Sequence, residues 1–310
     1  MAFAETVSTY LIAFREGLEA ALLVAIVLAF LSRTNRIGLS RYAWYGVEGA
    51  VVASVTVGGA ILVFYGNLSE SNQVLFEGLA ALLAVGVLTS MIYWMAVKGR
   101  YIKKQVEHRI EIAAAGGTVL AVAGLTFVLV FREGLETVLF VTPFLVIDVA
   151  ATLAGAAAGL AFALGLAYAI FRVGVKLDLR KFFYFTSILL VLLAAGLLGY
   201  GIHELIEYGE LQGMAFGWWG QSAYDLATYG ISANSLFGHK GAVGSIAAVM
   251  LGYSVSPEWA RIVAQATYLA VALPLVILVY RRPEWLSIAR AWLRSWLRAE
   301  AAPTTAPHEE

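Results

Sequence analysis

The chain has 310 residues, of which 61% are hydrophobic and 14% are charged, and its mean hydropathy is +0.80. A soluble domain is about 45–50% apolar and about 25% charged, so this composition excludes an ordinary soluble protein. The formal net charge is zero, which argues against nucleic acid as a partner. The chain contains no cysteine, which excludes disulfides, thiolate metal sites and cysteine nucleophiles.

Seven stretches approach or exceed the roughly 20 apolar residues that a helix needs to cross a bilayer. They are residues 7–31, 42–66, 72–97, 115–146, 150–171, 182–208 and 257–280. Basic residues collect in alternate connections, namely between spans 1 and 2, 3 and 4, 5 and 6, and after span 7. Because positively charged loops stay in the cytoplasm, the N-terminus is predicted outside and the C-terminus in the cytoplasm. The sequence therefore predicts an all-α polytopic membrane protein with seven transmembrane helices.

The pentad Arg-Glu-Gly-Leu-Glu occurs twice, at Arg15–Glu19 in span 1 and at Arg132–Glu136 in span 4. Because the copies lie three spans apart, their chain directions through the membrane are opposite. This pattern indicates a 3+3 inverted repeat, residues 7–97 against 115–208, with the span 257–280 appended. Transporters built in this way hold their substrate near the midplane, where the two halves meet.

The pentads supply four acids at membrane depth. Charged residues at the centre of a membrane helix cost at least about 2.5–3.5 kcal/mol each, so they mark a pathway or binding site by default. Glu16 and Glu19 share a helix face at a three-residue spacing, and Glu133 and Glu136 repeat that spacing. Carboxylates are hard oxygen ligands that suit magnesium, calcium, manganese and iron. Two converging pairs therefore predict a cation site.

The remaining pentad residues support these acids. We expect Arg15 and Arg132 to pair with carboxylates of a neighbouring helix and to keep the acids ionised. Gly17 and Gly134 remove a side chain beside the acids, which lets helices approach or lets the backbone reach the ion. Four carboxylates and two guanidiniums sum to a negative charge that a di- or trivalent cation offsets. The alternative is a cluster that only pins helices together.

A second acidic group lies at the outer end of span 6. Its members are His203, Glu204, Glu207 and Glu210, of which positions 203, 207 and 210 share one helix face. This group predicts a metal-capture site, and the alternative is a solvated helix end. The run lacks the second histidine of an HExxH zinc protease, so that match fails. Glu77 in span 3 either lines the path or extends to the nearer interface.

Two segments lie outside the spans. The outer loop, residues 209–256, is rich in aromatic residues and contains an apolar patch, 242–251, that suits a re-entrant or interfacial element. Residues 1–282 form the predicted permease domain. Residues 283–310 follow as a basic amphipathic helix on the cytoplasmic leaflet and a disordered tail.

These residues resemble the oxidase-dependent iron permeases, which include the fungal high-affinity iron permease and the permease of a bacterial inner-membrane ferrous-iron uptake system. The duplicated pentad is the hallmark of that family. The run Gly201–Gly209 and the stretch Leu251–Pro257 are similar to the bacterial branch. The resemblance covers roughly residues 5–280.

The resemblance implies a high-affinity iron permease in the plasma membrane, or in the inner membrane of a bacterium, and not an enzyme. Glu16, Glu19, Glu133 and Glu136 would ligate iron in transit, with Arg15 and Arg132 as essential companions. Iron is then the transported substrate, no cofactor is permanently bound, and an extracytoplasmic iron oxidase or iron-binding protein is the partner. Whether the protein forms a homo-oligomer is left open. The alternatives are a permease for lead or manganese, a non-transporting membrane subunit, and an intramembrane hydrolase.

Overall fold

The structure is a computed structural model that describes residues 2–98, 102–115, 119–170, 179–230, 232, 235, 237–238 and 244–281. Within these ranges every regular element is a helix, and β pairing is limited to an isolated bridge between Ser222 and Glu258. The prediction of an all-α protein is therefore confirmed. The predicted amphipathic helix and tail, residues 283–310, lie outside the described residues.

Long helices occupy the ranges in which the sequence predicts spans. They are α1 (Ala2–Arg33), α2 (Ser40–Gly66), α3 (Glu70–Lys98), α5 (Val119–Leu145), α6 (Val149–Tyr168), α7 (Leu179–Leu211) and α9 (Trp259–Arg281). Among the described residues, five helices are long and apolar enough to cross a membrane, namely α2 with the turn before it, α3, α6, α7 and α9. Helices α1 and α5 are comparably long but carry the charged pentads, so their crossing stays a prediction.

The outward faces of these helices are apolar. Val52, Val55 and Val63 of α2 are 65%, 70% and 68% exposed, and Leu120 of α5 is 80% exposed. Large apolar side chains that are exposed over whole helix faces are unfavourable in water, whereas lipid tails cover them without a cost. The chain is therefore a membrane protein.

Shorter helices join the long ones. They are the 3₁₀ turns Ile37–Leu39, Gly217–Gly220 and Leu226–Tyr229 and the helices α4 (Ile102–Ala115) and α8 (Gly244–Leu251). Helix α8 lies within the apolar patch that the sequence marks as re-entrant or interfacial. Helix α4 is not predicted from hydropathy because it is largely polar. It is attached through Val106 and Ile110, which are buried, and through an ion pair of 2.5 Å between Arg33 and Glu107.

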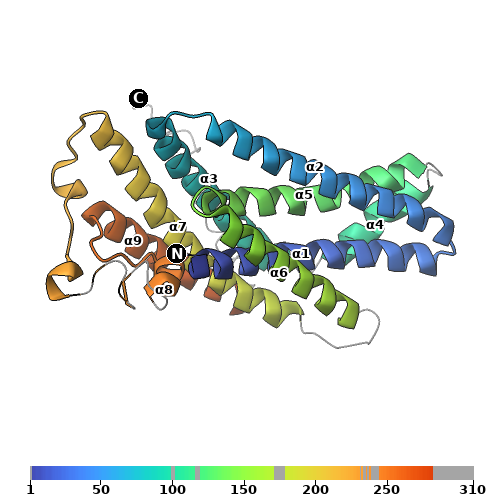
Figure 1. Ribbon diagram of the computed structural model, residues 1–310. Helices are drawn as coiled ribbons and strands as arrows, with labels where there is room; N and C mark the ends of the chain where they lie inside the picture. The colour runs from blue at the N-terminus through green and yellow to red at the C-terminus, as the bar shows by residue number, and fades with distance from the viewer. Residues whose placement is uncertain are drawn as a thin grey trace, which may run out of the picture.

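The long helices pack in pairs (Figure 1). Helix α1 packs along α6, α2 packs along α5, and α3 packs along α7. Helices α1 and α5, which carry the pentads, also touch each other, and α9 covers α7 and α3. This arrangement brings the middle of α1 against the middle of α5.

Glycines allow two of these pairs to approach at backbone distance. A Cβ on Gly46 of α2 would lie 2.3 Å from the carbonyl oxygen of Ala123 on α5. A Cβ on Gly155 of α6 would likewise lie 2.3 Å from the carbonyl oxygen of Thr6 on α1. No side chain fits at such distances, so the close contacts α2–α5 and α1–α6 both depend on glycine.

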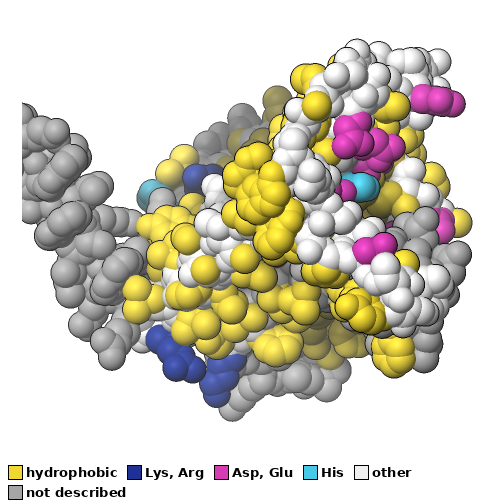
Figure 2. All heavy atoms as spheres, turned by 90° about the vertical axis from the view of Figure 1, so that its left-hand side faces the viewer, with side chains coloured by type: hydrophobic (Ala, Val, Ile, Leu, Met, Phe, Trp, Pro, Cys, Tyr) yellow, Lys and Arg dark blue, Asp and Glu magenta, His cyan; other side chains and the backbone are white. Residues whose placement is uncertain are grey.

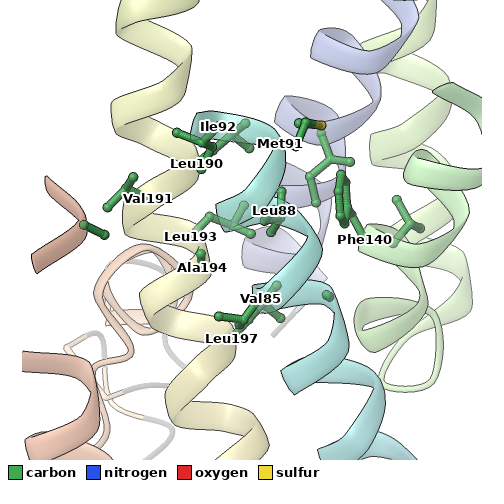
Figure 3. Close-up of a cluster of buried hydrophobic side chains, with 14 of the residues drawn as sticks. Val85, Leu88, Met91, Ile92, Phe140, Leu190, Val191, Leu193, Ala194 and Leu197 are labelled. Atoms are coloured by element: carbon green, nitrogen blue, oxygen red, sulfur yellow. The ribbon is translucent and has the colours of Figure 1, made fainter. Parts of the chain in front are cut away.

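The largest buried cluster lies between α3, α5 and α7 (Figure 3). We call its central residues the apolar layer: Val85 and Leu88 of α3, Phe140 of α5, and Leu193 and Leu197 of α7, each at most 7% exposed. Along α3 these residues come after Glu77 and before Met91, whose sulfur is 3.4 Å from Nη1 of Arg15. The apolar layer therefore separates the region of Glu77 from the first pentad.

Candidate metal centre

The two pentads meet near the middle of the helix bundle. Glu16 lies about halfway along α1, and Glu133 lies about halfway along α5. One carboxylate oxygen from each of Glu16, Glu19 and Glu133 lies within 4.8 Å of the other two. Oxygens that ligate one hard cation at about 2.0–2.6 Å are separated by such distances, so a single ion can touch all three.

These carboxylates are withdrawn from solvent and are incompletely paired. Glu16 is 1% exposed, Glu133 is 5% exposed and Glu19 is 9% exposed. The second oxygens of Glu16, Glu133 and Glu136 are buried and have no hydrogen-bond partner. Buried polar atoms without partners are costly and rare, so these oxygens mark a place for a ligand.

Glu136 has a different position from the other three acids. It lies outside the group of close oxygens, although it is near enough to Glu16 and Glu19 to interact with both electrostatically. One of its oxygens is held by Arg132. The structure therefore brings three of the four predicted acids together and places the fourth beside them.

The arginines pair within their own helices. The Nη1 and Nη2 atoms of Arg15 lie 2.6 Å from Glu16 and 2.8 Å from Glu19, and Nε of Arg132 donates to Glu136 at 2.8 Å. The prediction that each arginine pairs with a neighbouring helix is wrong. On a helix, residues four apart are neighbours on one face, so Glu19 and Glu136 lie within reach of Arg15 and Arg132, and the adjacent Glu16 also reaches Arg15.

The pentad glycines lie at helix contacts. A Cβ on Gly17 would lie 2.9 Å from Leu160 and 3.3 Å from Ala163, both on α6. A Cβ on Gly134 would lie 2.1 Å from Oγ of Ser54 on α2. Of the two roles that the sequence leaves open for these glycines, close approach of helices is therefore the one that the structure supports.

The outer acidic group assembles as a mixed cluster. One ligand atom from each of His203, Glu204 and Glu207 lies within 4.8 Å of the others, whereas Glu210 is not part of this group. Nδ1 of His203 is 2.7 Å from Oε1 of Glu258, at the start of α9. Burial acts to raise the pKa of Glu258, but the hydrogen bond and charge of His203, together with a backbone hydrogen bond and the charge of Arg261, outweigh burial, so the pKa lies below its ordinary value. Figure 2 shows acidic side chains gathered around a histidine on this face.

Glu77 is held inside the bundle by two tyrosines that the sequence reasoning missed. The hydroxyl of Tyr65 on α2 donates to Oε1 of Glu77 at 2.6 Å, and the hydroxyl of Tyr200 on α7 donates to Oε2. Tyr200 precedes Glu204 by one helical turn, so its presence on that face was readable from the spacing. No sequence signal identifies Tyr65. These bonds favour an interior position for Glu77 over one that extends to the interface.

Comparisons with known proteins agree with this arrangement. The sequence profile described as "Iron permease FTR1 family" matches residues 6–280. The chain is 46% identical over 271 residues to an uncharacterized protein of Archaeoglobus fulgidus, covering 87% of this chain and 94% of that protein. It is 35% identical over 288 residues to the ferrous iron permease EfeU of Yersinia pestis, covering 91% and 97% of the two chains. It is 33% identical over 272 residues to EfeU of Escherichia coli O6:H1, covering 87% and 94%.

No solved structure matches the chain. The profile match spans nearly all the described helices, and two of the relatives carry the name of a permease. The chain belongs to the iron permease FTR1 family, whose members are membrane transporters and not enzymes.

Proposed function

We propose that this chain imports iron across the plasma membrane, which is the inner membrane in a bacterium, through a carboxylate site formed by its two pentads. The observation that carries the proposal is the convergence of Glu16, Glu19 and Glu133 within 4.8 Å. These hard oxygen donors suit iron, and relatives of the chain are named ferrous iron permeases. Iron is the transported substrate here and not a resident cofactor.

The proposed topology has seven spans, with the N-terminus outside and the C-terminus in the cytoplasm. A 3+3 inverted repeat relates α1–α3 to α5–α7, and α9 is appended. The packing supports this proposal, because a two-fold axis that exchanges the halves would exchange the α1–α6 contact with the α2–α5 contact. Gly46 lies against Ala123, and Gly155 lies against Thr6. Ala123 has the same position relative to the second pentad as Thr6 has relative to the first. Residues 283–310 form a separate cytoplasmic segment.

The proposed route begins at the outer group of His203, Glu204 and Glu207, in which His203 and Glu207 reach the surface and Glu204 is buried behind them. Glu77 comes next, since Tyr200 links it to the helix face that carries Glu204. The ion then crosses the apolar layer, which must open, and reaches the pentad carboxylates before it leaves to the cytoplasm. Acidic groups at the entrance raise the local concentration of cations.

The proposed partner is an extracytoplasmic iron oxidase or iron-binding protein. The chain has no cysteine, and the candidate metal groups among the described residues hold a single histidine. Copper and haem centres that oxidise iron need histidine, cysteine or methionine ligands. Any oxidation coupled to import is therefore carried out by another protein.

The ion pairs of the pentads bear on the alternative of a non-transporting subunit. Arg15 bonds to Glu16 and Glu19, and Arg132 bonds to Glu136, so each pair lies within one helix. Such pairs do not tie α1 to α5. The geometry therefore favours a cation site over a structural clasp.

Uptake into proteoliposomes tests the proposal. Purified protein should take up iron, and Glu133→Gln should reduce the initial rate to the level of empty vesicles, because it removes the negative charge of a ligand with little change in side-chain shape. Glu48→Gln, at an exposed position on α2, is the matched control and should transport normally. Parallel assays with iron(II), iron(III), manganese(II) and lead(II) separate the iron permease from its metal alternatives. Normal iron uptake by Glu133→Gln would refute the proposed site.

A further inference from the structure

The two arginines of the pentads have the same sequence context but different surroundings. The side chain of Arg15 is 2% exposed, and that of Arg132 is 48% exposed. Tyr280 of α9 lies near enough to Arg15 to interact with it electrostatically. Arg15 is thus enclosed, with two carboxylates and the sulfur of Met91 beside it.

Arg132 is held between its own helix and α3. Its guanidinium carbon lies 4.9 Å from the ring centroid of Trp94, over the face of the indole. Its Nε atom donates to Glu136 on the next turn of α5. Tryptophan is the most favourable aromatic partner for a cation, and the attraction grows when water is excluded. The indole therefore stabilises one particular placement of this guanidinium.

That placement lies on one side of the carboxylate group. Helical side chains lean toward the N-terminus of their helix, and α5 begins at Val119. Trp94 lies one turn before Lys98, the end of α3. Under the proposed topology both helix ends are cytoplasmic, so Arg132 and Trp94 lie between the carboxylates and the cytoplasm.

The position of the Arg132 guanidinium affects the charge balance at the carboxylates. Glu16, Glu19 and Glu133 are accompanied by one enclosed guanidinium, that of Arg15, which leaves an excess of negative charge for a cation. If Arg132 moved toward these acids, it would compete with the cation for the same oxygens. Its present position leaves them available.

We propose that Trp94 is a positioning residue of this permease, which holds Arg132 on the cytoplasmic side of the pentad carboxylates and thereby keeps their oxygens free for the ion. This inference rests on the proposed function. Release to the cytoplasm then involves departure of the guanidinium from the indole and its return to the carboxylates. Arg15 remains in place throughout as the fixed counter-charge.

Equilibrium binding of radiolabelled iron(II) to detergent-purified protein, kept free of oxygen, tests the inference without requiring transport. Trp94→Leu should weaken binding by about two- to thirty-fold, the range of a cation–π contact. Trp94→Phe keeps an aromatic face and should restore part of the affinity. Trp44→Leu, at a half-exposed tryptophan of α2, is the matched control and should bind as the unmodified protein does.

A double-mutant cycle distinguishes positioning from a structural effect. If Trp94 acts through Arg132, Trp94→Leu should change the affinity of the Arg132→Gln protein by less than two-fold. An unchanged affinity of Trp94→Leu, or an equal loss in both backgrounds, would overturn the inference. Glu133→Gln serves as the reference for the site itself. If Glu133→Gln binds iron normally, the proposed function fails, whereas a normal Trp94→Leu beside a defective Glu133→Gln refutes only the role of Trp94.

Discussion

Gly134 of the second pentad lies directly against Ser54 of α2, so that a Cβ on Gly134 would come within 2.1 Å of Oγ and 2.8 Å of Cβ of Ser54. Gly17 of the first pentad faces the end of a flexible side chain instead, Cδ1 of Leu160 at 2.9 Å. The two glycines occupy the same place in the repeat but differ in how much room the opposing helix can give.

We expect Gly134→Ala to destabilise the protein by about 1–3 kcal/mol, the usual cost of overpacking, and Gly17→Ala to cost less because Leu160 can change rotamer. Thermal unfolding of the detergent-solubilised protein measures both. Gly124→Ala is the control on the same helix, since nothing lies within 4 Å of the added Cβ. Adding Ser54→Gly should restore much of the stability that Gly134→Ala loses. If it does not, the steric clash of the added Cβ is with a residue other than Ser54.

The four pentad acids should differ in their contribution to metal affinity. Glu16→Gln, Glu19→Gln and Glu133→Gln each remove the charge of one of the close carboxylates and should weaken binding about ten- to hundred-fold, as expected for a lost contact to a charged group. Glu136→Gln should have a smaller effect because Glu136 lies outside this group and is held by Arg132. Isothermal binding of iron(II) gives the four constants. Equal losses at all four positions would contradict the ranking.

The two arginines should differ in their contribution to stability. Arg15→Gln leaves Glu16 and Glu19 buried without their counter-charge and should cost about 3–5 kcal/mol. Arg132→Gln removes a half-exposed guanidinium, its pair with Glu136 and its contact with Trp94, and should cost less, about 0.5–3 kcal/mol. Chemical denaturation followed by tryptophan fluorescence measures both. A similar cost at both positions would show that the difference in enclosure between the two arginines has no energetic meaning.

The hydrogen bond between His203 and Glu258 gives a dependence on pH. The pKa of Glu258 in the folded protein lies below its ordinary value of 4.5, so ionisation of this carboxyl contributes stability above pH 4.5. That contribution should disappear as the pH falls through the lowered pKa. Stability curves of the unmodified protein and of Glu258→Gln should accordingly differ at neutral pH and converge in acid. A difference in stability between the two proteins that stays constant down to low pH would show that ionisation of Glu258 does not contribute to stability.

The positions of the helices were readable from the sequence to within a few residues. An apolar run of sufficient length fixes where a span lies, and the repeated pentad predicted that α1 and α5 bring their acids together. Hydropathy does not specify the rotation of a helix about its axis. The contacts Arg132–Trp94 and Tyr65–Glu77 depend on that rotation and were therefore not predicted. The polar helix α4 was missed for a related reason, because an apolar scan detects only what lipid would cover.

The direction of the arginine pairs was predicted wrongly for a local reason. Charge alone makes any carboxylate an acceptable partner, but a partner on the same helix is already in place before the helices associate. Arg15 and Glu19, one turn apart, meet without any tertiary contact. The same holds for Arg132 and Glu136. A repeated Arg-x-x-x-Glu spacing should be interpreted as an intrahelical pair first.

The apolar layer of Val85, Leu88, Phe140, Leu193 and Leu197 also bears on whether other ions leak through the resting protein. Close-packed hydrocarbon side chains hold no continuous column of water, so on the proposed route sodium ions and protons would not leak through this layer. A cell can therefore keep the permease in its membrane in quantity without dissipating its electrochemical gradients. On the proposed route each ion would have to wait for the helices to part, which would make throughput saturable and slow compared with that of an open channel.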